Sequence, residues 1–460
     1  MLVTSLDYYF FLTLVFFAFW IGRSRRLTPL ILVCAANLFF YGRWGVTYLV
    51  LIPAASTVDY FLGHLIYKTT GPIARRLAVS ASIVMNLGLI VVCRYVSLPA
   101  WHGIGLVLPL SLSFYAFQAL TYTIDIYRGD VKPSPGYLQY AASVSFFPTV
   151  LAGPITRVSS LIPQWSWKGV VLTGEEGSRG LFLIALGLAK KFLIADYLGN
   201  NLVNRVFDLP TLYSGGDVLV AVYAYAFQLY YDFSGYSDIA IGSALLLGIR
   251  LPANFNVPYR ATNLADFWRR WHISFSNWLR DYLYFSLPGK RTSWMPYIGL
   301  IITMTLGGIW HGAGSTFLIW GLLHGVGLAV YRLWQSQRRG APSPSRAPGR
   351  AGQVAGALLT FHYVLLGWIF FRAASVTAAF SILRQIGSLR YTFENTTPAF
   401  LCVLVLAALV HFVPASWFNG SIIRFARTPA LIQAAALALL ALAIRYVSAT
   451  GAAPFIYSKF

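Results

Sequence analysis

Long apolar stretches recur from one end of this 460-residue chain to the other, and they restrict it to folds that a lipid bilayer can hold. A helix needs about 20 mostly apolar residues to cross the hydrocarbon core, and in lipid its backbone must satisfy its own hydrogen bonds. Pro148 and the Gly153–Pro154 pair interrupt one region, so broken or re-entrant helices are expected in the middle third. Full or half spans are predicted near residues 8–22, 28–42, 46–67, 77–97, 104–126, 178–198, 216–231, 233–249, 294–311, 314–334, 354–373, 398–416 and 428–448.

The composition agrees with this class. With 57% hydrophobic and only 11% charged residues, the chain lacks the polar surface that a soluble protein of this size needs. It is predicted to be an all-α polytopic membrane protein. The formal net charge of +21 would suit nucleic acid, but the apolar and aromatic surroundings favour anionic lipid headgroups, so no nucleic-acid partner is expected. Cys34, Cys93 and Cys402 lie alone in apolar runs without metal-ligand spacing, and no metal site is predicted.

Basic residues alternate between the ends of the early predicted helices. They follow the first, third and fifth helices (Arg23, Arg25 and Arg26; Lys68, Arg75 and Arg76; Arg128 and Lys132), whereas the turns between them carry only Arg43 and His102. Because Lys and Arg gather on the cytoplasmic side, the N-terminus is predicted to lie outside. The start of the chain has no basic region, so a removable signal peptide is not expected. Residues 335–353, rich in Pro, Ser and Arg, are predicted to form a flexible cytoplasmic loop.

Two histidines are the first candidates for chemistry. His311 ends an apolar segment with glycines on both sides, which are expected to give a bulky ligand close access, and Trp310 is expected to supply an aromatic wall. Imidazoles within a membrane are costly and usually functional. His64, His362 and His411 are interpreted as packing elements that form hydrogen bonds. His324 lies between Gly321 and Gly325, where close helix packing explains its surroundings.

The second histidine, His272, lies in a segment that the sequence predicts to be one amphipathic helix. Asn263 is the expected N-cap, and aromatic residues recur at helical spacing on one face (Phe267, Trp271, Phe275, Trp278 and Tyr282). The other face carries Arg269, Arg270, His272, Ser276, Asn277, Arg280 and Asp281. This helix can be a plain interfacial anchor, or its arginines can bind an anionic headgroup or nucleotide.

A third polar segment, Tyr231–Asp238, places two carboxylates near Gly235. Asp232 and Tyr236 share a face if the helix is continuous, and an unwound turn there would line a polar cavity. A structural ion pair of Asp232 with a residue such as Arg260 or Arg269 is the competing interpretation.

Several motifs follow one another along the chain in a distinctive order. They are Ser145–Pro148 with Ala152–Ile155 and Arg157, Tyr231–Asp238, Asn254–Tyr259, Phe267–Ser274 with Trp278–Tyr282, Gly307–Ala313, and Pro454–Tyr457 near the C-terminus. Together they resemble the membrane-bound O-acyltransferase (MBOAT) family, and within it the alginate O-acetyltransferase branch. Their order and spacing make a chance match very improbable.

The resemblance implies a single domain over residues 1–460, with a motif core at about 110–373 and a helical bundle around a funnel or tunnel. His311 matches the family's invariant catalytic histidine, and His272 matches the second histidine of the bacterial branch. The donor is expected to be a cytoplasmic thioester, with acetyl-CoA as co-substrate and no bound cofactor. Donor or substrate contacts are expected from Trp310, Arg269, Arg270, Arg280, Asp232, Tyr236, Asp238 and Asn254, and further donor contacts from Lys290 and Arg291.

The leading hypothesis is therefore a bacterial inner-membrane O-acetyltransferase that passes acetyl groups toward an exopolysaccharide such as alginate or cellulose. A periplasmic, acetyltransferase- or esterase-like partner is expected to complete the transfer. The alternative from another class is a proton-coupled transporter or polysaccharide flippase, since broken helices and intramembrane Asp and His suit both. A scaffold without chemistry is a third possibility, which the presence of both histidines makes less attractive.

Overall fold

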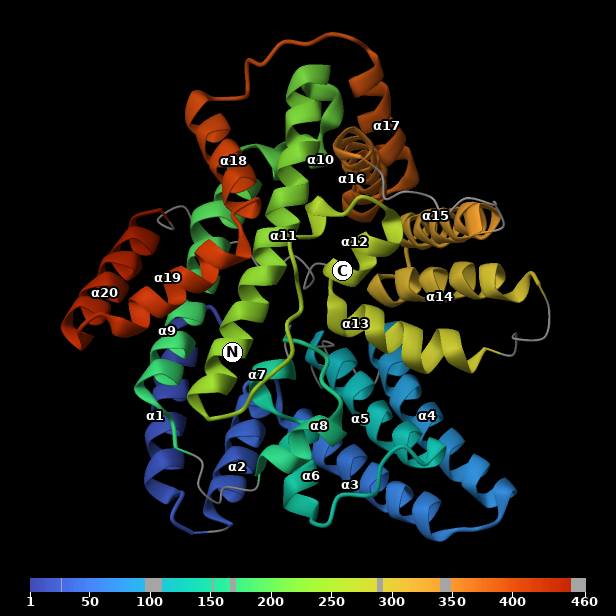
Figure 1. Ribbon diagram of the computed structural model, residues 1–460, viewed down its shortest axis with the longest axis vertical. Coiled ribbons are helices and arrows are strands. Elements are labelled where there is room, and N and C mark those ends of the chain that lie inside the picture. Colours follow the sequence, from blue (N-terminus) through green and yellow to red (C-terminus); the bar gives the residue numbers. More distant parts are fainter. Residues whose placement is uncertain are drawn as a thin grey trace. The chain divides into compact units, whose positions relative to one another are not determined.

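The computed structural model describes residues 1–25, 27–95, 110–150, 153–165, 171–287, 293–339 and 349–447. Within these ranges the chain forms helices and connecting turns, with no strand, as Figure 1 shows. Predicted features on Arg26, Cys93, His102, Lys290, Arg291, residues 340–348 and the C-terminal Pro454–Tyr457 lie outside the described residues or side chains.

In the part of the chain that the structure describes, five helices are long and apolar enough to cross a membrane: Val46–Lys68, Pro72–Val92, Ser315–Gln337, Arg350–Arg372 and Ala430–Val447. The bent pair Pro398–His411 and Ser416–Arg427 makes a sixth if it is one broken span. Their outward side chains are apolar, as at Leu359 and Leu439. Such surfaces need lipid around them. The predicted class, a multi-pass helical membrane protein, is confirmed.

The chain divides into two compact units. The first comprises Met1–Gly187, Tyr236–Ala253 and Ile422–Pro429, and the second comprises Leu188–Gly235, Asn254–Ser421 and Ala430–Phe460. The helices of the first unit are α1 (Leu6–Gly22), α2 (Thr28–Gly42), α3 (Val46–Lys68), α4 (Pro72–Tyr95), α5 (Leu110–Arg128), α6 (Tyr137–Val144), α7 (Phe147–Val150), α8 (Val158–Leu161) and most of α9 (Gly174–Ala189).

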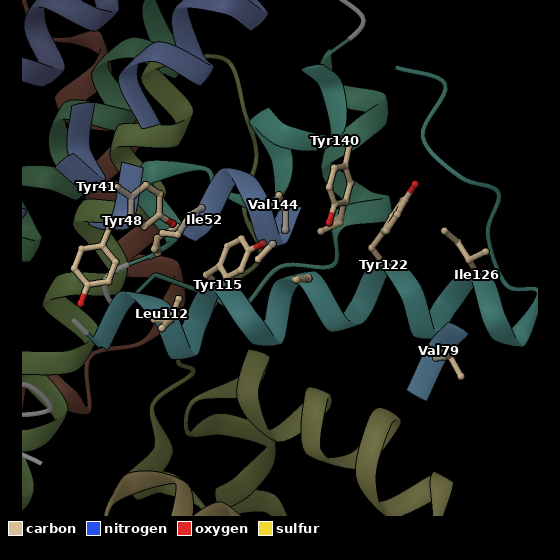
Figure 2. Packing of buried hydrophobic residues seen from close by; sticks show 14 of the residues in the cluster. Tyr41, Tyr48, Ile52, Val79, Leu112, Tyr115, Tyr122, Ile126, Tyr140 and Val144 are labelled. Atoms are coloured by element: carbon tan, nitrogen blue, oxygen red, sulfur yellow. The ribbon is translucent and has the colours of Figure 1, made fainter. Parts of the chain in front are cut away.

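Helices α3, α4 and α5 form the centre of the first unit around buried tyrosines. Tyr41, Tyr115, Tyr122 and Tyr140 belong to one buried cluster, part of which Figure 2 shows along α5. A Cβ atom on Gly63 would collide with the Tyr122 ring, so glycine lets α3 approach α5 closely.

A polar network joins the same three helices. The two carboxylate oxygens of Asp59 accept hydrogen bonds from Ser82 Oγ at 2.6 Å and from Asn86 Nδ2 at 2.8 Å. Ser82 Oγ also lies 2.8 Å from Thr123 Oγ1. The carboxylate is therefore buried with hydrogen-bond donors on both oxygens, as a group in a low-dielectric interior requires.

The predicted break in the middle third is present. Between α6 and α7 the chain leaves the helix. Asn37 of α2 forms hydrogen bonds with a backbone amide and a side chain at this break. Its Oδ1 accepts from the Phe147 amide at 2.9 Å, and its Nδ2 donates to Ser145 Oγ at 3.1 Å. Non-helical backbone within a membrane protein is tolerated only with such internal partners.

The helices of the second unit include α10 (Asn204–Asp208), α12 (Leu264–Arg270), α13 (Ile273–Trp278), α14 (Met295–His311), α15 (Ser315–Arg339), α16 (Arg350–Arg372), α17 (Val376–Gly387), α18 (Pro398–His411) and α20 (Ala430–Val447). Since α15 extends to Arg339 and α16 begins at Arg350, the ends of the predicted loop 335–353 are helical. Helices α11 (Gly215–Leu246) and α19 (Ala415–Arg427) each have residues in both units.

Helix α11 (Gly215–Leu246) corrects one prediction. The two separate spans expected at 216–231 and 233–249 are a single helix of 32 residues. No proline interrupts it, and Gly235 alone lowers helix propensity by only about 1 kcal/mol, which packing overrides. The unwound turn that was considered at Gly235 is therefore absent from α11.

Candidate active site

The hairpin of α14 and α15 positions His311. The two helices lie side by side in Figure 1, and glycines allow their backbones to touch. A Cβ atom on Gly321 would lie 2.6 Å from the carbonyl oxygen of Met304, and one on Gly325 would lie 2.7 Å from Cα of Ile301. The predicted close packing at Gly321 and Gly325 is confirmed, and it fixes the end of α14, where His311 lies.

The glycines beside His311 have a different role from the one expected. A Cβ on Gly308 or Gly312 would collide with Phe317, and one on Gly307 would lie 3.2 Å from Leu279 Cδ1. Protein atoms fill these positions, so the prediction that they open space for a ligand is wrong. They allow the neighbouring chain to pack around the imidazole instead.

His311 is the last residue of α14, is 5% exposed and lies within a cage of aromatic rings. The centroid of its ring is 4.6 Å from Trp310, 5.0 Å from Phe371, 5.2 Å from Trp320 and 5.9 Å from Phe275. Trp310 thus lies where an aromatic wall was predicted. Such a shielded imidazole stays weakly hydrated, which favours proton transfer to and from a bound group over exchange with water.

His272 lies on the same phenyl ring as His311. Its imidazole stacks on Phe275 with a centroid distance of 5.1 Å and an angle of 25° between the rings. Phe233 of α11 also packs against His272, with 4.6 Å between the ring centroids. The structure therefore brings together the two histidines that the sequence singled out.

The segment around His272 is not the single amphipathic helix that was predicted. It breaks after α12, and α13 and the π-helix η7 (Leu279–Leu283) follow. His272 takes left-handed backbone angles with φ 41° and is buried, so it does not lie on the polar face. The predicted cap at the start is confirmed, because Asn263 Oδ1 accepts from the Asp266 amide at 2.8 Å.

Residues 254–256 cause this break. The Asn256 amide donates to the Arg270 carbonyl at 2.9 Å, and the Ile273 amide donates to the Asn254 carbonyl at 2.9 Å. The side chain of Asn254 adds an acceptor for Ser274 Oγ at 2.8 Å. These bonds replace helical ones, and the left-handed residue turns the imidazole inward.

Asn254 also fixes the protonation pattern of His272. Because Asn254 Oδ1 accepts from Ser274, its 3.1 Å contact with His272 Nδ1 requires a proton on that nitrogen. Burial lowers the pKa of His272 to about 3, since a charged imidazole loses its hydration there. His272 is neutral at physiological pH, with the lone pair on Nε2.

The three arginines expected to bind the donor all pair with neighbouring carboxylates. Arg269 and Arg270 contact Asp266 at 3.7 Å and 2.9 Å, and Arg280 contacts Asp281 at 2.7 Å. The side chains of Arg269 and Arg280 are 70% and 53% exposed. Exposed ion pairs are worth only about 0–1 kcal/mol, so an anionic ligand can compete for these guanidinium groups.

Asp232 forms an ion pair, but with a different partner from those expected. Lys191 Nζ lies 2.7 Å from Asp232 and 2.8 Å from Asp196, and all three side chains are buried. Lys191 and Asp196 belong to the π-helix η3 (Lys190–Asp196), a form often found at functional sites. Arg260 instead contacts the backbone and ring of Phe412.

The remaining predicted contact residues, Tyr236 and Asp238, belong to the first unit, whereas His272, His311 and Asn254 belong to the second. Tyr236 Oη lies 3.5 Å from Thr4 Oγ1. Sequence reasoning missed Lys191, Asp196 and Trp320, and it named Phe275 only as part of an aromatic helix face. Charged residues within the apolar stretch 178–198 were an available signal for the first two, but no local pattern marks Trp320 or Phe275 as a neighbour of His311.

Three other histidines that the structure describes, His64, His362 and His411, each have a hydrogen bond. His64 Nδ1 lies 2.9 Å from the Tyr60 carbonyl, His362 Nε2 lies 2.7 Å from Tyr223 Oη, and His411 Nε2 accepts from a backbone amide at 3.2 Å. These contacts agree with the packing roles predicted for them. Among the described residues, no three His, Cys, Asp or Glu side chains are grouped so that they could hold a metal ion.

Residues 131–376 match the MBOAT, membrane-bound O-acyltransferase, family. The chain is 34% identical to the peptidoglycan O-acetyltransferase of Helicobacter pylori, over 83% of this chain and 78% of that protein. It is 35% identical to the probable alginate O-acetylase AlgI of Azotobacter vinelandii, over 87% of this chain and 81% of that protein. A teichoic acid D-alanyltransferase of Bacillus subtilis is 29% identical over 57% of this chain and 68% of its own length. The chain therefore belongs to the membrane-bound O-acyltransferase family and is an acyltransferase.

Proposed function

We propose that this protein transfers an acetyl group from a cytoplasmic thioester, acetyl-CoA, to a hydroxyl group on the other side of a bacterial inner membrane. The observation that carries the proposal is the aromatic cage around His311, which shares Phe275 with the neutral His272. Relatives named for O-acetylation of alginate and of peptidoglycan support an acetyl group as the cargo and a secreted or cell-wall polysaccharide as its destination.

His311 acts as the general base. It takes the proton of the acceptor hydroxyl while the oxygen attacks the thioester carbonyl and the new C–O bond forms. The tetrahedral intermediate then breaks its C–S bond, and the thiolate takes the proton back from the imidazolium. The products are an acetyl ester and a free thiol, and His311 returns to its starting state.

His272 serves this reaction as a hydrogen-bond acceptor. With its proton on Nδ1 held by Asn254 and its pKa lowered to about 3, it cannot supply a proton to the departing thiol at neutral pH. Its Nε2 can instead accept a hydrogen bond from the donor's amide groups or from the acceptor hydroxyl, which orients that group for attack.

The donor's phosphates bind the exposed Arg269 and Arg280 and the half-buried Arg270. Guanidinium groups suit phosphate because they offer a planar fork of donors. In this proposal the acetyl group crosses to the opposite leaflet, where the acceptor or a periplasmic acetyltransferase-like partner receives it. The N-terminus lies on that outer side, in keeping with the basic residues after α1, α3 and α5.

The test uses the full chain purified into lipid vesicles with labelled acetyl-CoA and polysaccharide fragments of the alginate, cellulose and peptidoglycan types. We expect thiol release and labelled acetyl ester with the wild-type protein. His311→Ala is expected to lower the rate by about 10² to 10⁴-fold, the usual contribution of a general base. The matched control is His362→Ala, which removes an exposed imidazole on α16 and should leave the rate unchanged.

Full transfer by His311→Ala would contradict the assignment of the base. If the wild-type protein left the thioester intact but moved protons or polysaccharide across the vesicle membrane, the transporter alternative would replace the proposal.

A further inference from the structure

His324 is a fully buried imidazole on α15 whose surroundings the packing of α14 on α15 does not explain. Gly321 and Gly325 face α14, as described above. His324 instead contacts Trp268 of α12 and faces Gly367 of α16. A phenyl ring would fill the same space without bringing polar nitrogens into the interior.

One nitrogen of His324 has a defined partner. Trp268 Nε1 donates to His324 Nδ1 at 3.3 Å, so the lone pair lies on Nδ1 and the neutral ring carries its proton on Nε2. Among the described residues, Nε2 is buried and has no hydrogen-bond partner. A Cβ atom at position 367 would lie 2.9 Å from Nε2, so the glycine leaves room for this nitrogen.

Trp320 connects His324 with His311. It lies one helical turn before His324, and the two ring centroids are 4.9 Å apart. Its indole meets the His311 ring edge-on, at 5.2 Å and an angle of 89°. Trp268 also packs against Trp320, at 5.8 Å. The Trp268–His324 pair therefore borders the ring that forms one wall of the His311 cage.

We propose that His324 is a positioning residue for the acyl transfer. By accepting the Trp268 hydrogen bond, it holds α12 against α15 and fixes the indole of Trp320, which in turn sets the orientation of the His311 imidazole. This inference rests on the proposed role of His311 as the base. A misplacement of about 1 Å in such a group can cost up to about 10²-fold in rate.

Two substitutions separate positioning from space filling. His324→Phe keeps the ring and removes the acceptor, whereas His324→Asn is smaller but places an amide oxygen near the position of Nδ1. We expect His324→Phe to lower kcat by about 10 to 10²-fold with an unchanged KM for acetyl-CoA, and His324→Asn to retain more activity. If the imidazole only filled space, the order would be reversed, because the phenyl ring preserves volume better.

Two further variants sharpen the result. Gly367→Ala should resemble His324→Phe, because the added carbon displaces Nε2 without removing it. The control is Leu359→Ala, on the exposed side of α16, the helix that carries Gly367, and it should not change kcat. In a double-mutant cycle, Trp268→Phe combined with His324→Phe should be no worse than either change alone, since both remove the same hydrogen bond.

A spectroscopic measurement keeps this inference separate from the proposed function. With ¹⁵N-labelled histidine the chain gives signals from only seven imidazoles. The His311 signals should shift in His324→Phe and stay in place in Leu359→Ala. A shift without any acetyl-CoA turnover by the wild-type protein would reject the proposed function and retain the positioning role. Normal turnover with unmoved His311 signals in His324→Phe would overturn the positioning role.

Discussion

The polar group at the centre of the first unit and the one at the centre of the second are held in opposite ways. Asp59 is fixed by hydrogen bonds from Ser82 and Asn86, whose donors meet both carboxylate oxygens. His311 is bounded by the rings of Trp310, Trp320, Phe275 and Phe371. A network of the first kind stabilises helices against one another, whereas a ring of aromatic side chains shapes a space in which an imidazole can react.

The second unit also contains a buried polar group with charged partners, the ion cluster of Lys191, Asp196 and Asp232. The largest effect on stability is expected there. Lys191→Met leaves Asp196 and Asp232 facing each other without their shared ammonium group. Breaking a buried pair in this way should lower the free energy of unfolding by about 3–5 kcal/mol. Unfolding by denaturant in detergent measures this loss in the free energy of unfolding. The control, Arg280→Ala at an exposed pair, should change little, and equal losses in both variants would contradict the structural role of the cluster.

The cage itself depends on backbone contact between α14 and α15. Gly321→Leu forces the two helices apart, because even a Cβ atom would lie 2.6 Å from the Met304 carbonyl oxygen. Overpacking typically costs about 1–3 kcal/mol, and the displaced His311 should also lose activity. Gly349→Leu is the control, because no atom of the described residues lies within 4 Å of a Cβ added there. Normal turnover by Gly321→Leu would show that the hairpin does not set the position of His311.

The comparison predicts that Asp59 affects stability and not chemistry. Asp59→Ala leaves the Ser82 hydroxyl and the Asn86 amide without their shared acceptor, a loss of about 1–3 kcal/mol. The turnover per folded molecule should remain that of the wild type. A specific loss of kcat at full folding would break the distinction between the two centres.

The last effect is the pH dependence from His272, which near neutral pH is small. Its pKa in the folded protein, about 3, lies below the ordinary value of 6.5, so the unfolded chain binds more protons between these values. Stability from this group is fully present above pH 6.5 and falls with acid, by up to about 1.4 kcal/mol per pH unit. Unfolding measured from pH 8 to pH 5 should lose this slope in His272→Asn. An identical slope in the variant would show that His272 titrates normally.

Much of this architecture follows from local pattern. Helix α2 has the bounds predicted for it, 28–42, and the cap at Asn263 was readable because an Asn before an apolar run accepts from the first turn. His272 and His311 could be chosen as candidates because imidazoles in apolar or amphipathic membrane segments are usually functional, and the family resemblance matched the same two residues. The break of the helix at His272 could not be predicted from local pattern. Its cause is hydrogen bonding to Asn254 and Asn256, which lie 14 to 18 residues away along the chain.

The amino-acid sequence by itself determined that the chain is a helical membrane protein, since hydrophobicity and helix signals are summed over neighbouring residues. It also determined the family, through motifs in a fixed order. Only the tertiary structure decided that Lys191 is the partner of Asp232, that α11 is continuous, and that Trp320 and Phe275 enclose His311. These are contacts between residues far apart in sequence, chosen by packing and charge compensation in three dimensions, which no local periodicity encodes.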